Sequence, residues 1–131
     1  RSACVFGAGG ILIASKYQVG VTSQVARSSA GAVNRLKIAR VDDLAAELHA
    51  FFERGIQTVG TVLDAEATAT ECDLRKPTAL VIGNEGAGMT PEVRAACRQS
   101  VRIPQASKFD SLNAAVATGV LLYEVHRQRL S

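Results

Sequence analysis

The sequence predicts an α/β domain with a mostly parallel sheet and helices on both faces. Strand-like and helix-like segments alternate along the whole chain. Residues 78–82 form its most apolar strand, which is typical of a central parallel strand covered on both sides. The chain has 131 residues, of which 47% are hydrophobic. That is enough for one domain with a core and too few for two.

The first part of the chain predicts two strands with a helix between them. Residues 10–14 form a short apolar run, which indicates a buried strand. Thr22 or Ser23 can cap a helix that continues to about Ser29. Residues 35–39 alternate between polar and apolar side chains, which indicates a second strand.

The middle of the chain predicts a helix, a strand and a connecting segment. Apolar residues recur at helical spacing over residues 41–52, and Gly55 follows as a C-cap. Residues 57–63 are rich in β-branched side chains and predict a strand. Residues 64–77 are polar and contain a proline, so we expect a loop or a short helix there.

The last third predicts a helix, a short strand and a final helix. Thr90-Pro91-Glu92 is a typical helix start, and we expect this helix to reach about Gln99. Residues 101–103 predict a strand that must stop at Pro104. The final helix is marked by apolar or small residues at helical spacing: Leu112, Val116, Gly119, Val120 and Tyr123.

Composition excludes several classes of protein. No apolar run approaches the roughly 20 residues of a membrane span, so we expect no membrane partner. The formal net charge of +3 permits an anionic partner without establishing one. The opening residues resemble ordinary domain sequence and not a signal peptide, so we expect a cytoplasmic protein.

The cysteines and histidines predict neither disulfides nor a metal site. Three cysteines are scattered without C-x-x-C spacing, which favours reduced thiols that serve in packing. His49 and His126 do not stand near a Cys, Asp or Glu at the spacing of metal ligands. We therefore expect no metal.

Two loops after apolar strands are the candidate ligand site. Residues 83–88 place three glycines in six positions, which allows a sharp turn and close approach of a nucleotide-like ligand. A tight turn alone would also explain them, and Glu85 is either a hydrogen-bond acceptor for a ligand or a solvated carboxylate. In the second loop, Ser111 and Asn113 stand at the start of the final helix. One can cap the helix, which leaves the other for a ligand.

Together these loops resemble a known enzyme family. Residues 82–88, then Arg102-Ile103-Pro104, then residues 111–119 resemble the second and third signature motifs of the SpoU/TrmH branch of the SPOUT RNA methyltransferases. Residues 1–8 look like the tail of the first motif, so the resemblance covers essentially the whole chain. The sequence from Ser111 to Arg129 looks closest to the subgroup that methylates guanosine in large-subunit ribosomal RNA.

The resemblance implies a fold, a reaction and partners. It implies a SPOUT catalytic domain over residues 1–131, whose C-terminal segment forms a trefoil knot. The implied reaction is methylation of a ribose 2′-hydroxyl, with S-adenosylmethionine as cofactor and no metal. The implied partners are RNA, rRNA before tRNA, and a second copy of the chain bound through the last helix. In the family a strand and an asparagine precede the motif arginine, and we expect both to be absent here, along with any N-terminal RNA-binding domain.

The resemblance also assigns residues to roles. Arg1 would activate or orient the 2′-hydroxyl, Glu85 would position Arg1 or the ribose, and Ser111 and Asn113 would line the reaction centre. The implied cofactor-binding residues, several of them acting through the backbone, are Gly83, Asn84, Ile103, Pro104 and Leu112. Two alternatives remain: a tRNA ribose 2′-O-methyltransferase, and a non-catalytic dimerising module that binds cofactor or RNA.

Overall fold

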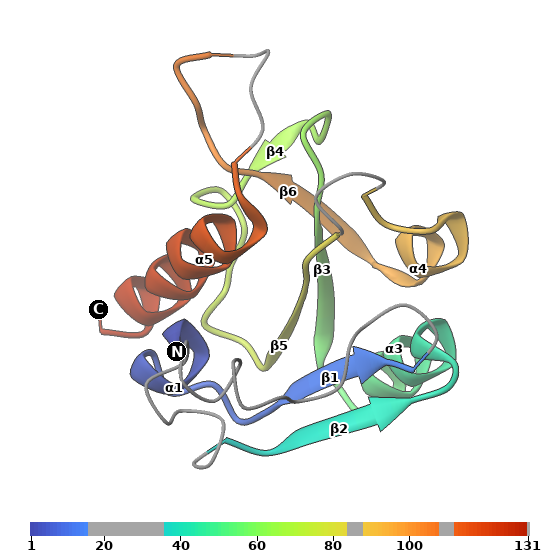
Figure 1. Cartoon of the computed structure of the whole chain (residues 1–131). Coiled ribbons are helices and arrows are strands. Elements are labelled where there is room, and N and C mark those ends of the chain that lie inside the picture. Colours follow the sequence, from blue (N-terminus) through green and yellow to red (C-terminus); the bar gives the residue numbers. More distant parts are fainter. Residues whose placement is uncertain (16–35, 84–87, 108–111, 131) are drawn as a thin grey trace. The chain divides into compact units, whose positions relative to one another are not determined.

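The chain consists of two compact units, Arg1–Leu44 and Ala45–Ser131. The computed structural model in Figure 1 describes residues 1–15, 36–83, 88–107 and 112–130. The helix predicted after Thr22 lies outside the described residues. Assignment of residues 1–131 to a single catalytic domain stays a prediction.

The first unit contains a short helix and two parallel strands. Helix α1 (Ser2–Val5) precedes strand β1 (Ile11–Ala14), which confirms the strand predicted over residues 10–14. Strand β2 (Ile38–Val41) pairs with β1 along its full length, from Ile11 with Ile38 to Ala14 with Val41.

Strand β2 differs from its prediction at both ends. It begins three residues later than residue 35, because its pairing with β1 starts at Ile38. Val41, which we predicted to be helical, is the last residue of the strand. The carbonyl of Val41 accepts hydrogen bonds from the Ser15 backbone N–H (2.9 Å) and Ser15 Oγ (3.0 Å). These bonds hold Val41 in the sheet, and helix α3 (Leu44–Glu53) begins at Leu44.

The second unit is built on a four-stranded sheet in which all described pairings are parallel. Its strands are β3 (Gln57–Thr61), β4 (Ala67–Thr68), β5 (Thr78–Val81) and β6 (Gln99–Arg102), in the spatial order β4-β6-β3-β5. Two predictions are wrong here. Strand β5 lies at the end of this sheet and not at its centre, and the segment predicted as loop or short helix contains β4.

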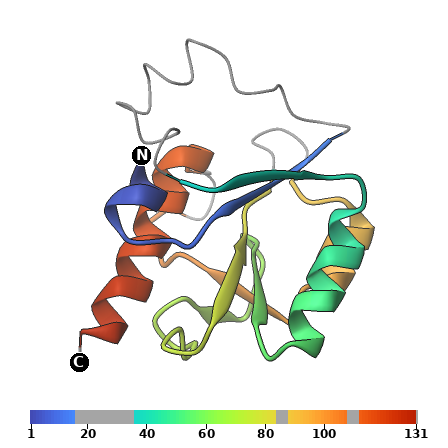
Figure 2. The ribbon, with the colours of Figure 1, turned by 90° about the horizontal axis from the view of Figure 1, so that it is seen from below.

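Helices cover both faces of this sheet, as predicted. Successive residues of a strand face opposite sides. Val59 of β3 belongs to the main core cluster with Val101 and with Leu121 of helix α5 (Ala114–Arg129). Thr58, on the opposite face, donates a hydrogen bond to the carbonyl of Ala96, the last residue of helix α4 (Pro91–Ala96). Figure 2 shows α5 on one side of the strands and α4 on the other.

The start of α4 was predicted correctly, but its end was not. Thr90 caps α4 as expected, since its Oγ1 accepts a hydrogen bond from the Val93 N–H (3.3 Å). The helix ends at Ala96 and not near Gln99, because Cys97 adopts extended backbone (ψ 119°) and Gln99 already belongs to β6. Gly55 has φ +84°, which is the left-handed conformation expected just after α3.

A buried carboxylate on α5 makes part of the stability depend on pH. Glu124 is 8% exposed, and hydrogen bonds from Arg127, and secondarily from Gln128, hold its pKa below the usual value of glutamate. Its contribution is therefore complete above the glutamate pKa of about 4.3 in the unfolded chain and is lost as the pH falls below it. We expect Glu124→Gln to show a smaller loss of melting temperature between pH 6 and pH 2.5 than the unmodified chain, measured by circular dichroism. Parallel curves for both proteins would contradict this assignment.

Candidate functional site

The carboxyl ends of three strands meet at one edge of the second unit. Thr61 of β3 pairs with Val101 of β6, and Gly60 pairs with Val81 of β5. Because all three strands are parallel, the segments that leave them begin next to one another. These segments include both predicted ligand loops, and a third that starts at Val62. This edge is where open α/β sheets bind ligands.

The loop after β5 folds back on itself at Gly83. A Cβ atom at Gly83 would stand 2.9 Å from both the Gly88 carbonyl carbon and the Met89 nitrogen. Both are backbone atoms, so only glycine fits without a shift of the chain. Gly88 has φ +69°, which glycine adopts without strain. Gly83 therefore lies directly against the backbone of Gly88 and Met89, so the two ends of this loop are close together.

A residue that we did not predict adds a polar group to this edge. Thr61 ends β3 and is half-buried, and its Oγ1 is buried without a hydrogen-bond partner among the residues that the structure describes. A buried hydroxyl without a partner costs free energy, so Thr61 Oγ1 is a candidate for a hydrogen bond to a ligand. The sequence offers only a weak indication of this role, because Thr61 is simply a hydroxyl-bearing residue at the end of a strand rich in β-branched residues.

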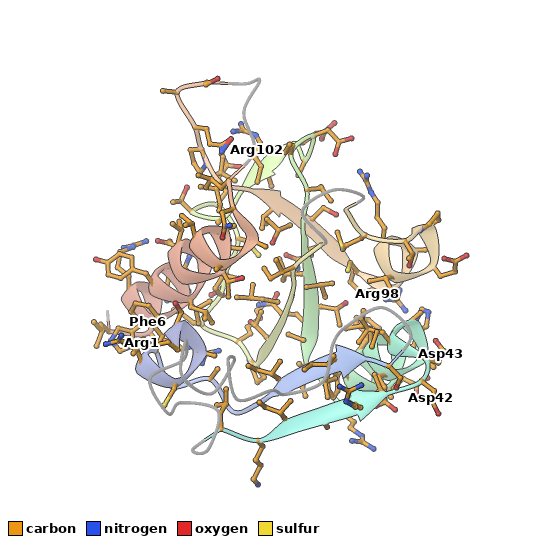
Figure 3. All side chains as sticks on the ribbon, in the orientation of Figure 1. Arg1, Phe6, Asp42, Asp43, Arg98 and Arg102 are labelled. Atoms are coloured by element: carbon orange, nitrogen blue, oxygen red, sulfur yellow. The ribbon has the colours of Figure 1, made fainter. Side chains whose placement is uncertain are left out.

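Two arginines hold the segment that follows Thr61. Arg102, labelled in Figure 3, lies at the end of β6, and its Nε donates to the carbonyl of Ala65 (3.1 Å). Arg94 of α4 contacts Asp64 with an Nη2–Oδ1 distance of 3.0 Å. The Arg94–Asp64 ion pair is largely exposed and contributes little stability by itself. Together the two contacts attach residues 64–65 to β6 and α4, which keeps the third segment in place at the site.

The second predicted loop leads directly into α5. Asn113 is the N-cap, and its Oδ1 accepts hydrogen bonds from the backbone N–H groups of Ala115 (2.8 Å) and Val116 (3.3 Å). The capping role that we weighed for Ser111 or Asn113 is thus taken by Asn113, and only its side-chain amide nitrogen remains for a ligand. Ile103 is half-buried against the core, whereas Pro104 and Leu112 are exposed.

The remaining predicted site residues stay predictions. Asn84, Glu85 and Ser111 lie outside the described residues. Arg1 belongs to the first unit, where it is exposed and precedes α1 without a capping bond from its side chain. The catalytic role assigned to Arg1 stays a prediction.

The two cysteines of the second unit are packing residues. Burial raises the pKa of Cys97, and burial together with the nearby Asp73 raises that of Cys72. Both thiols therefore keep their protons at neutral pH, and each donates a hydrogen bond, Cys72 to Gln99 Oε1 (2.9 Å) and Cys97 to the Val93 carbonyl (3.3 Å). A protonated, hydrogen-bonded thiol is a poor nucleophile.

The described residues contain neither a group of metal ligands nor a helix that could span a membrane. No group of three or more His, Cys, Asp or Glu side chains stands close enough to hold a metal ion within the described ranges. None of the described helices combines the length and the apolar character needed to cross a membrane.

The chain is similar to a known family over most of its length. Residues 1–123 match the SpoU rRNA Methylase family. The chain belongs to this family. Among its SpoU relatives is YacO of Bacillus subtilis (strain 168), named as a TrmH-family tRNA/rRNA methyltransferase, which is 45% identical over 129 residues. That match covers 98% of the chain and 52% of YacO, so the chain spans about half the length of this relative.

Solved SpoU structures confirm the fold. The methyltransferase AviRb of Streptomyces viridochromogenes, solved with the cofactor AdoMet, superimposes with a TM-score of 0.91 and 34% identity over 98% of the chain and 53% of AviRb. A structure described as an RNA 2′-O ribose methyltransferase superimposes with a TM-score of 0.85 and 35% identity over 99% of the chain and 50% of that protein. The SpoU family and the α/β fold of its SPOUT members are thereby confirmed, while the trefoil knot stays a prediction.

Proposed function

We propose that this chain is the catalytic domain of an RNA 2′-O-ribose methyltransferase that uses S-adenosylmethionine. The observation that carries this proposal is the superposition of 98% of the chain on a family member that holds AdoMet. The ribose specificity is supported by the relative described as an RNA 2′-O ribose methyltransferase. Three free cysteines are compatible with a cytoplasmic enzyme, because the cytoplasm keeps thiols reduced.

The residues at the carboxyl edge fit this cofactor. Its adenine ring carries both donors and acceptors, which Thr61 Oγ1, without a partner among the described residues, and nearby backbone groups could satisfy. The proposed backbone contacts come from Gly83, where a Cβ atom has no room, and from Ile103 and Leu112. Asn84 and Pro104 complete the proposed set. When bound, S-adenosylmethionine supplies an electrophilic methyl group.

The residues proposed for catalysis must orient the ribose hydroxyl and receive its proton. Glu85 carries a carboxylate that can accept a hydrogen bond from that hydroxyl or position Arg1. Arg1 is a permanent donor and would orient the ribose through the adjacent phosphate. Ser111 and the side-chain amide of Asn113 would line the reaction centre. Precise orientation is the main demand of such a transfer, since it removes the entropy cost of bringing the reactants together.

The proposed substrate is a guanosine in ribosomal RNA, and transfer RNA is the second candidate. The end of the chain resembles the rRNA guanosine subgroup, whereas the name of YacO includes both RNA classes. The discriminating experiment is transfer of a tritiated methyl group by the intact protein to purified rRNA and purified tRNA in separate reactions. Label in rRNA alone supports the first candidate, and label in tRNA alone supports the second. Label in neither would favour a non-catalytic binding module.

We expect the chain to bind S-adenosylmethionine or its demethylated product, because the edge carries a buried hydroxyl with no partner among the described residues and a tight turn that only glycine fits. Isothermal titration calorimetry measures this directly. Absence of heat at millimolar cofactor would contradict the proposed cofactor site.

We also propose that the protein is a homodimer that associates through α5. Four apolar side chains at helical spacing are exposed along this helix and the residue before its cap: Leu112, Val116, Val120 and Tyr123. A row of exposed apolar residues on one helix is typical of a contact with another subunit. The helix therefore has apolar residues on two sides, because Leu121 faces the core.

We expect Val120→Asp to convert the dimer to a monomer, because a carboxylate at the centre of an apolar contact would lose its hydration. Analytical ultracentrifugation gives the molecular mass. Ala95→Asp is the matched control, since it introduces the same charge at an exposed position of α4. A Val120→Asp protein with the mass of the unmodified chain would place the interface elsewhere.

A further inference from the structure

The last turns of α5 bind the backbone of a segment that precedes β5. Gln128 Oε1 accepts a hydrogen bond from the Leu74 N–H (2.8 Å), and Gln128 Nε2 donates to the Cys72 carbonyl (3.1 Å). Arg129 Nε donates to the Leu74 carbonyl (3.2 Å), and Arg129 Nη2 donates to the Lys76 carbonyl (2.8 Å). Two adjacent side chains of one helix thus form hydrogen bonds with four backbone groups of residues 72–76.

These contacts set the position of α5 in a way that apolar packing cannot. Leu74 and Leu121 are both fully buried in the same core cluster. Apolar contact decides which side of the helix faces inward, but it has no direction and allows small slides and rotations. Hydrogen bonds require defined distances and angles. Because Leu74 offers a donor and Cys72 an acceptor, the orientation of the Gln128 amide is also determined.

Glu124 keeps Gln128 in place. Its Oε1 accepts a hydrogen bond from Gln128 Nε2 (2.9 Å), one turn earlier on the same helix. Arg127 donates to the same carboxylate through Nη2 (2.7 Å) and Nε (2.9 Å), and within the described part of the chain its side chain makes no hydrogen bond to residues 72–76. Arg127 therefore provides a control position that lies beside Gln128 but outside the contact.

We propose that Gln128 and Arg129 are positioning residues for the cofactor end of α5. The helix has 16 residues and is about 24 Å long at 1.5 Å per residue. Its first turn follows Leu112 and the cap Asn113, and its last turns carry the two anchoring side chains. Because a helix is rigid, contacts that fix the C-terminal end of α5 also fix the position of its N-terminal end. This inference rests on the proposed function, which places Leu112 and Asn113 at the cofactor and the reaction centre.

The test compares Gln128→Met with Arg127→Met. Methionine has nearly the length of glutamine but cannot make its three hydrogen bonds. We expect Gln128→Met to weaken binding of S-adenosylmethionine about tenfold in calorimetry, well below its melting temperature. Arg127→Met should bind like the unmodified chain. Should Gln128→Met fail to fold, Arg129→Lys is the second variant, because lysine keeps the charge but loses the fork that binds two carbonyls.

A second readout does not depend on cofactor. The side-chain amide resonance of Asn113, followed by nuclear magnetic resonance, should shift in Gln128→Met or Arg129→Lys and stay in place in Arg127→Met. Unchanged affinity together with an unmoved Asn113 resonance in a folded variant would overturn the inference. If the unmodified chain binds no cofactor, the proposed function fails, and the Asn113 resonance alone decides whether the anchor positions the helix start.

Discussion

Asn113→Asp should leave the protein as stable as before and lower methyl transfer on the order of 100-fold. The Oδ1 of Asn113 caps α5 by accepting from two backbone N–H groups. Aspartate caps a helix as well as asparagine does, and its charge suits the positive end of the helix dipole. The substitution therefore keeps the cap and removes the side-chain N–H donors, which are the groups left for a substrate. Thermal melting and the kcat/KM of the intact protein measure the two roles separately.

Asn113→Ala is the companion variant, because it removes both roles. We expect it to lose about 1 kcal/mol of stability in addition to activity, as is typical for a lost N-cap. Asn113→Ser is the control for the cap, since serine caps a helix without carrying an amide. If Asn113→Asp transfers methyl groups at the unmodified rate, Asn113 is a cap and nothing more.

Gly83→Ala should abolish cofactor binding while the domain still folds. The added Cβ would stand 2.9 Å from backbone atoms of Gly88 and Met89, and neither can rotate away as a side chain would. The loop must open to admit it, which costs about 1–3 kcal/mol of stability and moves the backbone proposed to contact the cofactor. We expect no binding to be detectable by calorimetry, with a circular dichroism spectrum like that of the unmodified chain.

Gly9→Ala is the matched control for this substitution. A Cβ atom at Gly9 would have no neighbour within 4 Å, so its effect on stability should stay within about 0.5 kcal/mol. Affinity that is equal in Gly83→Ala and Gly9→Ala would show that the turn at Gly83 does not form part of the cofactor site.

Most elements were predictable from local patterns, and the errors arose where a pattern was ambiguous or where strand pairing decided the structure. The start of α4 was correct because Thr90 and Pro91 carry the chemistry of a helix N-terminus in their own side chains. Val41 was misplaced because an apolar residue fits both the end of a strand and the start of a helix. Strand β4 has two residues, which is too short for any period, and it exists through its pairing with β6. Strand β5 is apolar, but apolarity reports burial and not the number of neighbouring strands.

The candidate site residues also differ in whether the local sequence or the fold reveals them. Gly83 and the cap Asn113 were recognisable because each carries its chemistry in its residue type and in its place beside a strand or helix, whereas Ser111 stays a prediction. Thr61 was missed because nothing local distinguishes it from other strand threonines. Its hydroxyl becomes significant once the pairing with β6 brings it to the edge where the loops begin.

The amino-acid pattern was sufficient for the α/β class, the SpoU family, the places of the two candidate loops and the cap candidates, because these depend on residue types in short stretches of the sequence. The order of the strands, the closure of the Gly83 turn onto Gly88 and Met89, the capping role of Asn113 and the anchoring of α5 on residues 72–76 required the folded chain. The physical reason is sequence separation. Gln128 lies 54 residues from Leu74, and no local preference indicates which distant backbone a side chain will meet.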